Sequence, residues 1–236
     1  AVEYVIFRNG AEGDATNRNR PYSTITEAEK TYAAAVATDM AVQCVRLEAS
    51  WCGVENISQD KQDLLDEAEL LPTMNYGQLI AGAGLPGNAK YKTQQSALEE
   101  ILVGASDIAN EVGNTKIADP MASGQWSDVE SPHSWNSVAD FLDNIRSIRN
   151  AYYGSLDGSI SPASVSSCIV AIDKAVDAKV RSCIEEAIAK VDAMPRPFRN
   201  YITEKSGPMY EKIQEAIDAC NELVDALDEA NEIINQ

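Results

Sequence analysis

Residues 206–234, SGPMYEKIQEAIDACNELVDALDEANEII, decide the fold class of this chain. Apolar side chains recur there at steps of three and four residues, and Asp and Glu fill the opposite positions. The apolar stripe consists of Met209, Ile213, Ile217, Cys220, Val224, Leu227 and Ile234. This spacing follows the 3.6-residue turn of an α-helix and places the apolar side chains on one face. The stretch therefore predicts a long amphipathic helix near the end of the chain.

The same spacing recurs along most of the sequence. It predicts further helices over residues 24–53, 58–71, 93–120, 131–154 and 161–195, with a loop or broken helix between Pro72 and Gly87. In the first of them, Tyr32, Val36, Met40, Leu47 and Trp51 form the apolar stripe. No strand-like alternation competes with these patterns over a comparable length. The fold class is therefore all-α, with long antiparallel helices in up-and-down bundles.

Caps and helix breakers set the expected boundaries. Thr24–Glu27 reads as an N-terminal cap, and Gly53 as the end of the helix that follows. Ser131-Pro132 and Ser161-Pro162 each supply a cap and a first-turn proline, so each predicts a helix start. The helix from Thr93 is expected to end near Gly113 and Asn114 or at Pro120.

The formal charge of −18, from 37 acidic and 19 basic residues, argues against a nucleic-acid partner. Basic ligands and metal cations would be attracted instead. We expect most of the acids to lie on solvated helix faces, among them Asp173, Asp177, Glu185, Glu186, Asp218, Asp225, Asp228 and Glu229. No apolar run approaches the roughly 20 residues that span a bilayer, so we expect no transmembrane segment in this chain.

The metal-binding side chains are too few for the common transition-metal sites. The five cysteines show no Cys-x-x-Cys pair, and His133 is the single histidine. Glu130 and His133 have the spacing of a di-iron Glu-x-x-His unit, but Ser131-Pro132 predicts a helix start between them, so the two side chains need not share a face. The serines and cysteines likewise lack the His and Asp partners that would activate a nucleophile.

Several stretches resemble the imelysin-like family. They are the opening run AVEYVIFRNG at 1–10, the helix at 32–53 that ends in LEASWCG, the segment GASDIANEV within 97–120, and ESPHSWNSVADFLDNIRSIRNAYYG at 130–154. The resemblance covers most of the chain, and the last stretch is its most specific part. Their joint occurrence is a much stronger signal than any single motif.

The resemblance implies candidate site residues. Glu3 corresponds to the glutamate of the family's Gly-x-His-x-x-Glu motif and is the expected metal ligand, with the histidine expected just before Ala1. Arg8 could orient a carboxylate or bind an anion. The remaining pocket candidates are Trp51, Glu130, Ser134, Trp135 and Asn136. Read from the residues alone, the last three could line a pocket, or could form a helix-capping turn around a buried Trp.

The resemblance also implies an organisation and a function. Residues 1–130 would form part of a first bundle plus an inter-bundle segment, and 131–236 a bundle that completes the fold, with the N-terminal portion of the family fold absent from this chain. The expected function is iron uptake in the bacterial cell envelope, as a periplasmic protein or an outer-membrane lipoprotein whose signal or anchor lies upstream. Its partners would be iron or an iron chelate, and other envelope proteins; the bound ion would be iron, calcium or zinc.

Two alternatives remain open, a metal-dependent peptidase of the imelysin type and a structural helical scaffold that binds a protein partner. Binding is favoured over proteolysis, because a zinc peptidase commonly uses three protein ligands and a general base, and the residues present do not supply such a constellation.

Overall fold

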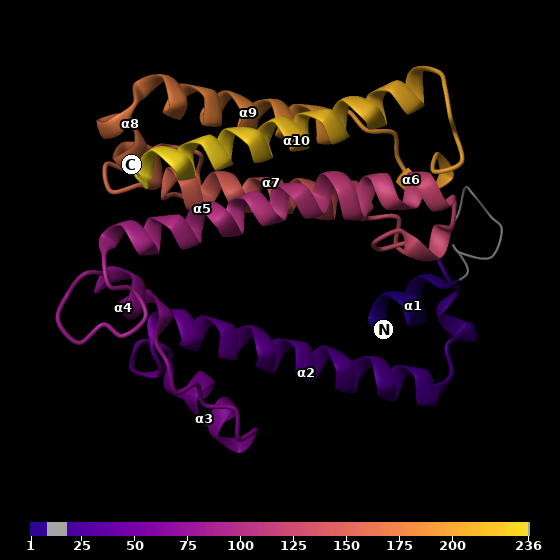
Figure 1. Ribbon diagram of the computed structural model, residues 1–236. Helices are drawn as coiled ribbons and strands as arrows, with labels where there is room; N and C mark the ends of the chain where they lie inside the picture. The colour runs from indigo at the N-terminus through magenta and orange to yellow at the C-terminus, as the bar shows by residue number, and fades with distance from the viewer. Residues whose placement is uncertain (9–17, 236) are drawn as a thin grey trace. The chain divides into compact units, whose positions relative to one another are not determined.

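The computed structural model describes residues 1–8 and 18–235, so Asn9 and Gly10 of the opening run lie outside the described residues. Within these ranges every regular element is helical, which confirms the all-α prediction. The chain forms two compact units, Ala1–Ala97 and Leu98–Gln236, which we describe separately (Figure 1).

The first unit is organised around the long helix α2 (Glu27–Cys52). Helices α1 (Val2–Phe7), α3 (Gln59–Glu67) and α4 (Tyr76–Ala81) all pack against α2. Thr26 caps α2 in the predicted region, in a capping box with Glu29. Gly53 ends the helix with a φ of 94°, a backbone conformation that favours glycine. Both boundaries of this helix were therefore predicted correctly.

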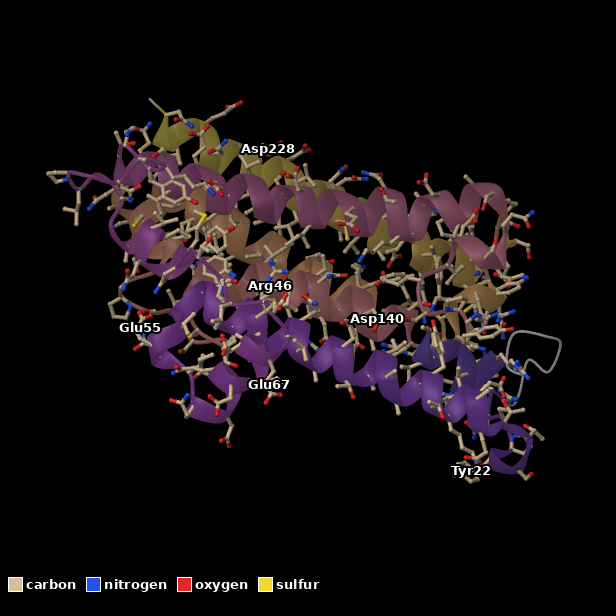
Figure 2. All side chains as sticks on the ribbon, turned by 90° about the horizontal axis from the view of Figure 1, so that it is seen from below. Tyr22, Arg46, Glu55, Glu67, Asp140 and Asp228 are labelled. Carbon is tan, nitrogen blue, oxygen red and sulfur yellow. The ribbon has the colours of Figure 1, made fainter. Side chains whose placement is uncertain are left out.

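The buried face of α2 differs from the predicted stripe. Val42 and Ala49 are buried, and they form a small core with Ile57 and Leu65. By contrast, exposed fractions exceed one half for Tyr32, Met40, Leu47 and Trp51. The helix thus carries apolar side chains on two faces, and the predicted stripe is the exposed one. Polar side chains cover other parts of this unit, as Figure 2 shows for Glu55 and Glu67, which extend away from the ribbon.

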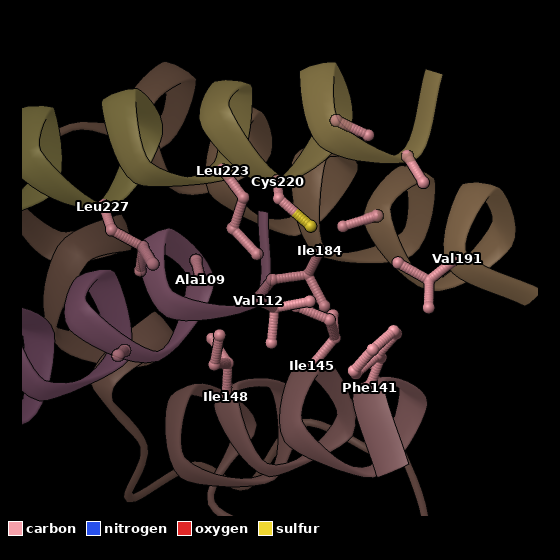
Figure 3. Packing of buried hydrophobic residues seen from close by; sticks show 14 of the residues in the cluster. Ala109, Val112, Phe141, Ile145, Ile148, Ile184, Val191, Cys220, Leu223 and Leu227 are labelled. Atoms are coloured by element: carbon pink, nitrogen blue, oxygen red, sulfur yellow. The ribbon is translucent and has the colours of Figure 1, made fainter. Parts of the chain in front are cut away.

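The second unit contains the main hydrophobic core. Its elements are α5 (Gln94–Asn110, which begins just before the unit), a π-helical segment (Glu111–Ala118), α6 (Asp119–Ser123), α7 (Ser137–Tyr153), α8 (Val165–Ile172), α9 (Lys174–Asp192) and α10 (Pro208–Ile234). Helix α10 packs on α9 and on the π-helical segment, and α7 packs on α9. Val112, Phe141, Ile145, Ile184 and Leu223 meet between these elements (Figure 3), and all five are fully buried.

The predicted boundaries of two helices were wrong. The helix from Thr93 does not end near Gly113 or at Pro120; it continues as the π-helical segment and α6 to Ser123. The predicted helix over 161–195 is two helices, because Asp173 has an extended backbone with a φ of −146°. The Asp173 side chain caps α9 by accepting hydrogen bonds from the amides of Ala175 and Val176.

The division into compact units falls at residues 97 and 98, whereas the sequence-based division falls at 130 and 131. The reason is that Leu102, Ala109, Val112 and Ile117 share one core with α7, α9 and α10. The assignment of residues 1–130 and 131–236 to separate bundles of the family fold stays a prediction.

A buried polar network joins α7, α8 and α9. Asp177 is only 1% exposed, so the expectation that it lies on a solvated face was wrong. Its Oδ1 accepts hydrogen bonds from Tyr152 at 3.1 Å and Ser166 at 2.6 Å, while its Oδ2 accepts one from Arg181 at 2.8 Å. Burial raises the pKa of the Tyr152 hydroxyl far above its usual value, and the Asp177 charge adds to this effect. The hydroxyl therefore stays a proton donor to the carboxylate.

The five cysteines, which all lie in the described ranges, are free thiols. In the same ranges, no helix has the length and apolar character needed to cross a membrane.

Candidate functional site

Residues Glu130–Asn136, which we call the ESPHSWN loop, lead into α7 through an unusual backbone. Ser131 has a φ of 50° and Trp135 a φ of 62°, in the left-handed region that side-chain-bearing residues rarely adopt. The helix therefore begins at Ser137, and the predicted start at Ser131-Pro132 was wrong. The Ser137 hydroxyl donates to the Glu130 carbonyl at 2.6 Å and closes the loop. Such strained backbone is typical of functional sites.

Lys116, in the π-helical segment, binds the first residue of this loop. Its Nζ lies 3.0 Å from Glu130 Oε2 and 3.6 Å from Glu111 Oε1, and it donates a hydrogen bond of 3.0 Å to Asn144 Oδ1 on α7. The lysine is largely shielded from solvent, with 17% of its side chain exposed. π-helical turns occur frequently at functional sites. This segment contacts the strained loop through Lys116, so both features indicate the same candidate region.

An aromatic and cationic cluster contacts the middle of the loop. The His133 ring meets the Trp126 ring edge to face, with 5.8 Å between centroids. Arg199 lies 5.0 Å above the centroid of Trp126 and donates a hydrogen bond of 2.8 Å to the Pro132 carbonyl. Partial burial lowers the pKa of the Arg199 guanidinium. The cluster can offer a cation, an imidazole and an aromatic face to a ligand.

The last residue of the loop contacts a carboxylate in the first turn of α7. Asn136 Nδ2 donates to Asp140 Oδ1 at 2.7 Å. The other oxygen, Asp140 Oδ2, is buried and has no hydrogen-bond partner among the described residues. Figure 2 labels Asp140 on α7. An oxygen of this kind is suited to accept a hydrogen bond from a ligand or to coordinate a cation.

The predicted residues Glu130, Ser134, Trp135 and Asn136 all lie in this one loop. Sequence reasoning missed Lys116, Trp126, Asp140 and Arg199, which support that loop. Asp140 could have been proposed from the sequence, because it lies four residues after Asn136 at a helix start. Neither Lys116 nor Arg199 is close to the loop in sequence.

The first unit holds Glu3 and Arg8 at α1. Glu3 lies in the first turn of this helix and is half-buried. Arg8 Nη1 forms an ion pair of 2.8 Å with Glu29 Oε1 on α2. The guanidinium of Arg20 is almost fully buried; it donates to the Val5 carbonyl at 3.1 Å and to both carboxylate oxygens of Glu29 at 3.0 and 2.9 Å. Glu29 therefore connects α1, which carries Glu3, to the first turn of α2.

This connection predicts a pH dependence. The hydrogen bonds from Arg20 and from the Thr26 amide lower the pKa of Glu29 from 4.5 to about 2. Since the folded-state pKa lies below the unfolded value, the stabilisation is complete above pH 4.5 and is lost as the pH falls toward 2. The protection of amides in the first turn of α2 against hydrogen exchange, relative to the intrinsic rate at each pH, should fall over this interval. Glu29→Gln should remove most of this pH dependence, and an unchanged profile would show that another group is responsible.

Trp51 lies at the other end of α2, half-exposed, with its ring 6.0 Å from that of Tyr76. Glu29 and Trp51 are separated by roughly 33 Å of helix at 1.5 Å per residue, so Arg8 and Trp51 are not brought together within this unit. Among residues 1–8 and 18–235, no three His, Cys, Asp or Glu side chains are grouped to hold a metal ion.

Comparison with known proteins identifies the family. The family model described as Imelysin matches residues 1–227. An imelysin peptidase from Bacteroides ovatus is 32% identical over 82% of this chain, with a TM-score of 0.60. A putative iron-regulated protein A precursor from Parabacteroides distasonis is 25% identical over 99% of this chain, with a TM-score of 0.76.

The chain spans 50% of the Bacteroides structure and 62% of the Parabacteroides structure. None of the curated proteins compared with the chain matches it. The match to the family model extends from Ala1 across the ESPHSWN loop to α10, so it includes both sets of candidate residues. This chain belongs to the imelysin family.

Proposed function

We propose that the protein binds an iron compound in the bacterial cell envelope and takes part in iron uptake. The observation that carries this proposal is the similarity to the Parabacteroides iron-regulated protein, which extends over 99% of the chain. The name "precursor" is consistent with export of that relative. By extension, a periplasmic or outer-membrane lipoprotein location and contacts with other envelope proteins form part of the proposal for this chain.

The ESPHSWN loop supports a binding role. Lys116 contacts the loop at Glu130 and Arg199 contacts it at Pro132, and the loop holds Ser131 and Trp135 in the left-handed backbone region. A preformed loop loses little conformational entropy when a ligand binds. Asp140 Oδ2, a carboxylate oxygen with no hydrogen-bond partner among the described residues, suits a hard cation such as ferric iron or calcium.

Glu3 is the proposed metal ligand in the first unit. Its carboxylate would act together with a histidine just before Ala1, because residues three apart on a helix project from the same face. The position of Glu3 on α1 suits this role, and Glu29 fixes α1 to α2 through Arg8 and Arg20. The ion held there would be iron, calcium or zinc.

A metal-dependent peptidase is the second candidate, and the name of the Bacteroides ovatus relative favours it. The two functions differ in an observable way. A peptidase turns over substrate and loses activity with a chelator, whereas a binding protein retains its ligand without turnover.

The test is the metal content of the full-length protein after exhaustive dialysis, followed by incubation with unstructured peptide substrates. We expect iron to be retained, no cleavage, and a roughly 10- to 100-fold weaker affinity for iron at the Glu3 site in Glu3→Ala. Asp39→Ala, which removes an exposed acid from α2, is the matched control and should retain iron normally. Chelator-sensitive cleavage would favour the peptidase, and equal retention by Glu3→Ala would remove Glu3 as a ligand.

A further inference from the structure

Arg8, the residue directly after α1, carries a charge that its protein partner does not fully neutralise. Its Nη1 lies 2.8 Å from Glu29 Oε1. The same carboxylate already binds Arg20, which donates hydrogen bonds of 3.0 and 2.9 Å to its two oxygens. One carboxylate therefore serves two guanidiniums, and one positive charge within this group of three side chains is not balanced.

The Glu29 carboxylate has no further capacity for Arg8. Its Oε2 also accepts hydrogen bonds from the Thr26 amide at 2.8 Å and from the Thr26 hydroxyl at 2.9 Å. A carboxylate offers about four lone-pair sites, and the contacts with Arg20, Thr26 and Arg8 fill them. The hydrogen bond from Arg20 is the main cause of the low pKa of Glu29. Glu29 is thus held by Arg20 and by the capping box of α2, and Arg8 is an additional cation beside it.

The Arg8 guanidinium keeps donors for another anion. A guanidinium carries N–H donors on each of its nitrogens, and the contact with Glu29 involves Nη1. Its Nε and Nη2 form no hydrogen bond with the part of the chain that the structure describes. The side chain is 33% exposed and lies 5.8 Å from the centroid of the Tyr4 ring, a cation–π contact that restrains it. Arg20, by contrast, is only 2% exposed and is closed to ligands.

An oxyanion is the ligand that suits this arrangement. The planar guanidinium pairs with carboxylate and phosphate oxygens through parallel N–H donors. A bare metal cation would be repelled by the unbalanced charge of Arg8, although Glu3, the proposed metal ligand, lies on the same helix. A compound that combines a metal ion with free oxyanion groups offers a partner to both side chains.

We propose that Arg8 binds an oxyanion group, carboxylate or phosphate, of the iron compound, so that the protein takes up iron as an anionic chelate. The part of this inference that concerns iron rests on the function proposed above. Anion binding by Arg8 does not require iron, because the donors and the unbalanced charge belong to the protein itself. The two parts can therefore be tested separately.

The test is isothermal titration calorimetry of the full-length protein with metal-free citrate, inorganic phosphate and ferric citrate. We expect saturable binding of at least one metal-free anion and of ferric citrate. Arg8→Gln should bind both about tenfold or more weakly, because it loses a charged hydrogen-bond donor. Arg8→Lys, which keeps the charge without the planar fork, should retain part of the affinity.

Arg46→Gln is the matched control. Arg46 is an exposed arginine on α2 (Figure 2) and forms no ion pair with the described residues, so this variant should bind all three compounds as the unaltered protein does. Because the Arg8 side chain is partly exposed, Arg8→Gln should keep the fold, as an unchanged thermal transition would verify.

The outcomes separate this inference from the proposed function. Binding of a metal-free anion that is lost in Arg8→Gln, with no iron bound by the unaltered protein, would support the anion site and contradict the iron function. Equal binding of ferric citrate by Arg8→Gln and the unaltered protein would leave the iron function and overturn the anionic chelate. The absence of saturable binding of either metal-free anion would overturn the proposal, as would equal loss in Arg8→Gln and Arg46→Gln.

Discussion

Replacement of Asp177 with Ala should lower the free energy of unfolding of the second unit by about 3 kcal/mol. The variant leaves the buried hydroxyls of Tyr152 and Ser166 without their acceptor, and each such loss typically costs about 1 to 3 kcal/mol. It also removes the partner of Arg181, but this side chain is 41% exposed and can be solvated, so we assign little of the cost to it. Thermal unfolding followed by circular dichroism and hydrogen exchange in α9 measure the effect.

Asp218→Ala is the matched control, because Asp218 is an exposed acid on α10. Its effect should lie within about 0.5 kcal/mol of zero. A double-mutant cycle with Tyr152→Phe should show that the two losses are not additive, since both variants remove the same hydrogen bond. Equal stability of Asp177→Ala and Asp218→Ala would mean that the network contributes nothing to the fold.

Gly113→Ala should destabilise the second unit by about 1 to 3 kcal/mol through overpacking. Gly113 lies in the π-helical segment, which packs against α10, and a Cβ built there would lie 2.9 Å from the Cβ of Cys220. Neither atom is the end of a flexible side chain, so the helices themselves must move apart. Because the same segment carries Lys116, the shift should also change the NMR signals of the ESPHSWN loop.

Gly104→Ala provides the control on the preceding helix, α5. A Cβ at Gly104 has nothing within 4 Å, so the higher helix propensity of alanine should stabilise the protein by up to about 1 kcal/mol. A lower free energy of unfolding for Gly113→Ala together with a higher one for Gly104→Ala would support close packing at Gly113. Similar stabilisation by both would show that the helices separate there without cost.

The sequence predicted the helical class and several helix ends because these depend on local chemistry. Thr26 and Gly53 act on their own helix, and the stripe on α10 follows from its period. The buried face of α2 and the burial of Asp177 depend on which elements meet, so the pattern of a single helix could not reveal them. Asp177 has the spacing of a surface acid, yet Tyr152 and Ser166 surround it from other helices.

The ESPHSWN loop shows the same limit at the site. Its residues were recognised because they form one contiguous stretch, but the left-handed backbone at Ser131 and Trp135 contradicts the helix start that Ser131-Pro132 normally signals. The supporting residues Lys116 and Arg199 come from distant segments, and their contacts with the loop arise only when the helices pack.

Iron retention by Lys116→Met, compared with Lys179→Met, tests the proposed binding role of the loop most directly. Each substitution removes one lysine: Lys116→Met loses the ion pairs with Glu130 and Glu111, and Lys179→Met loses the ion pair with Glu229. If the loop takes part in binding, Lys116→Met should weaken iron binding about 10- to 100-fold, because supporting groups orient the residues that contact the ligand. Lys179→Met should bind as the unaltered protein does. Equal binding by the two variants, or no iron bound by the unaltered protein, would contradict the account.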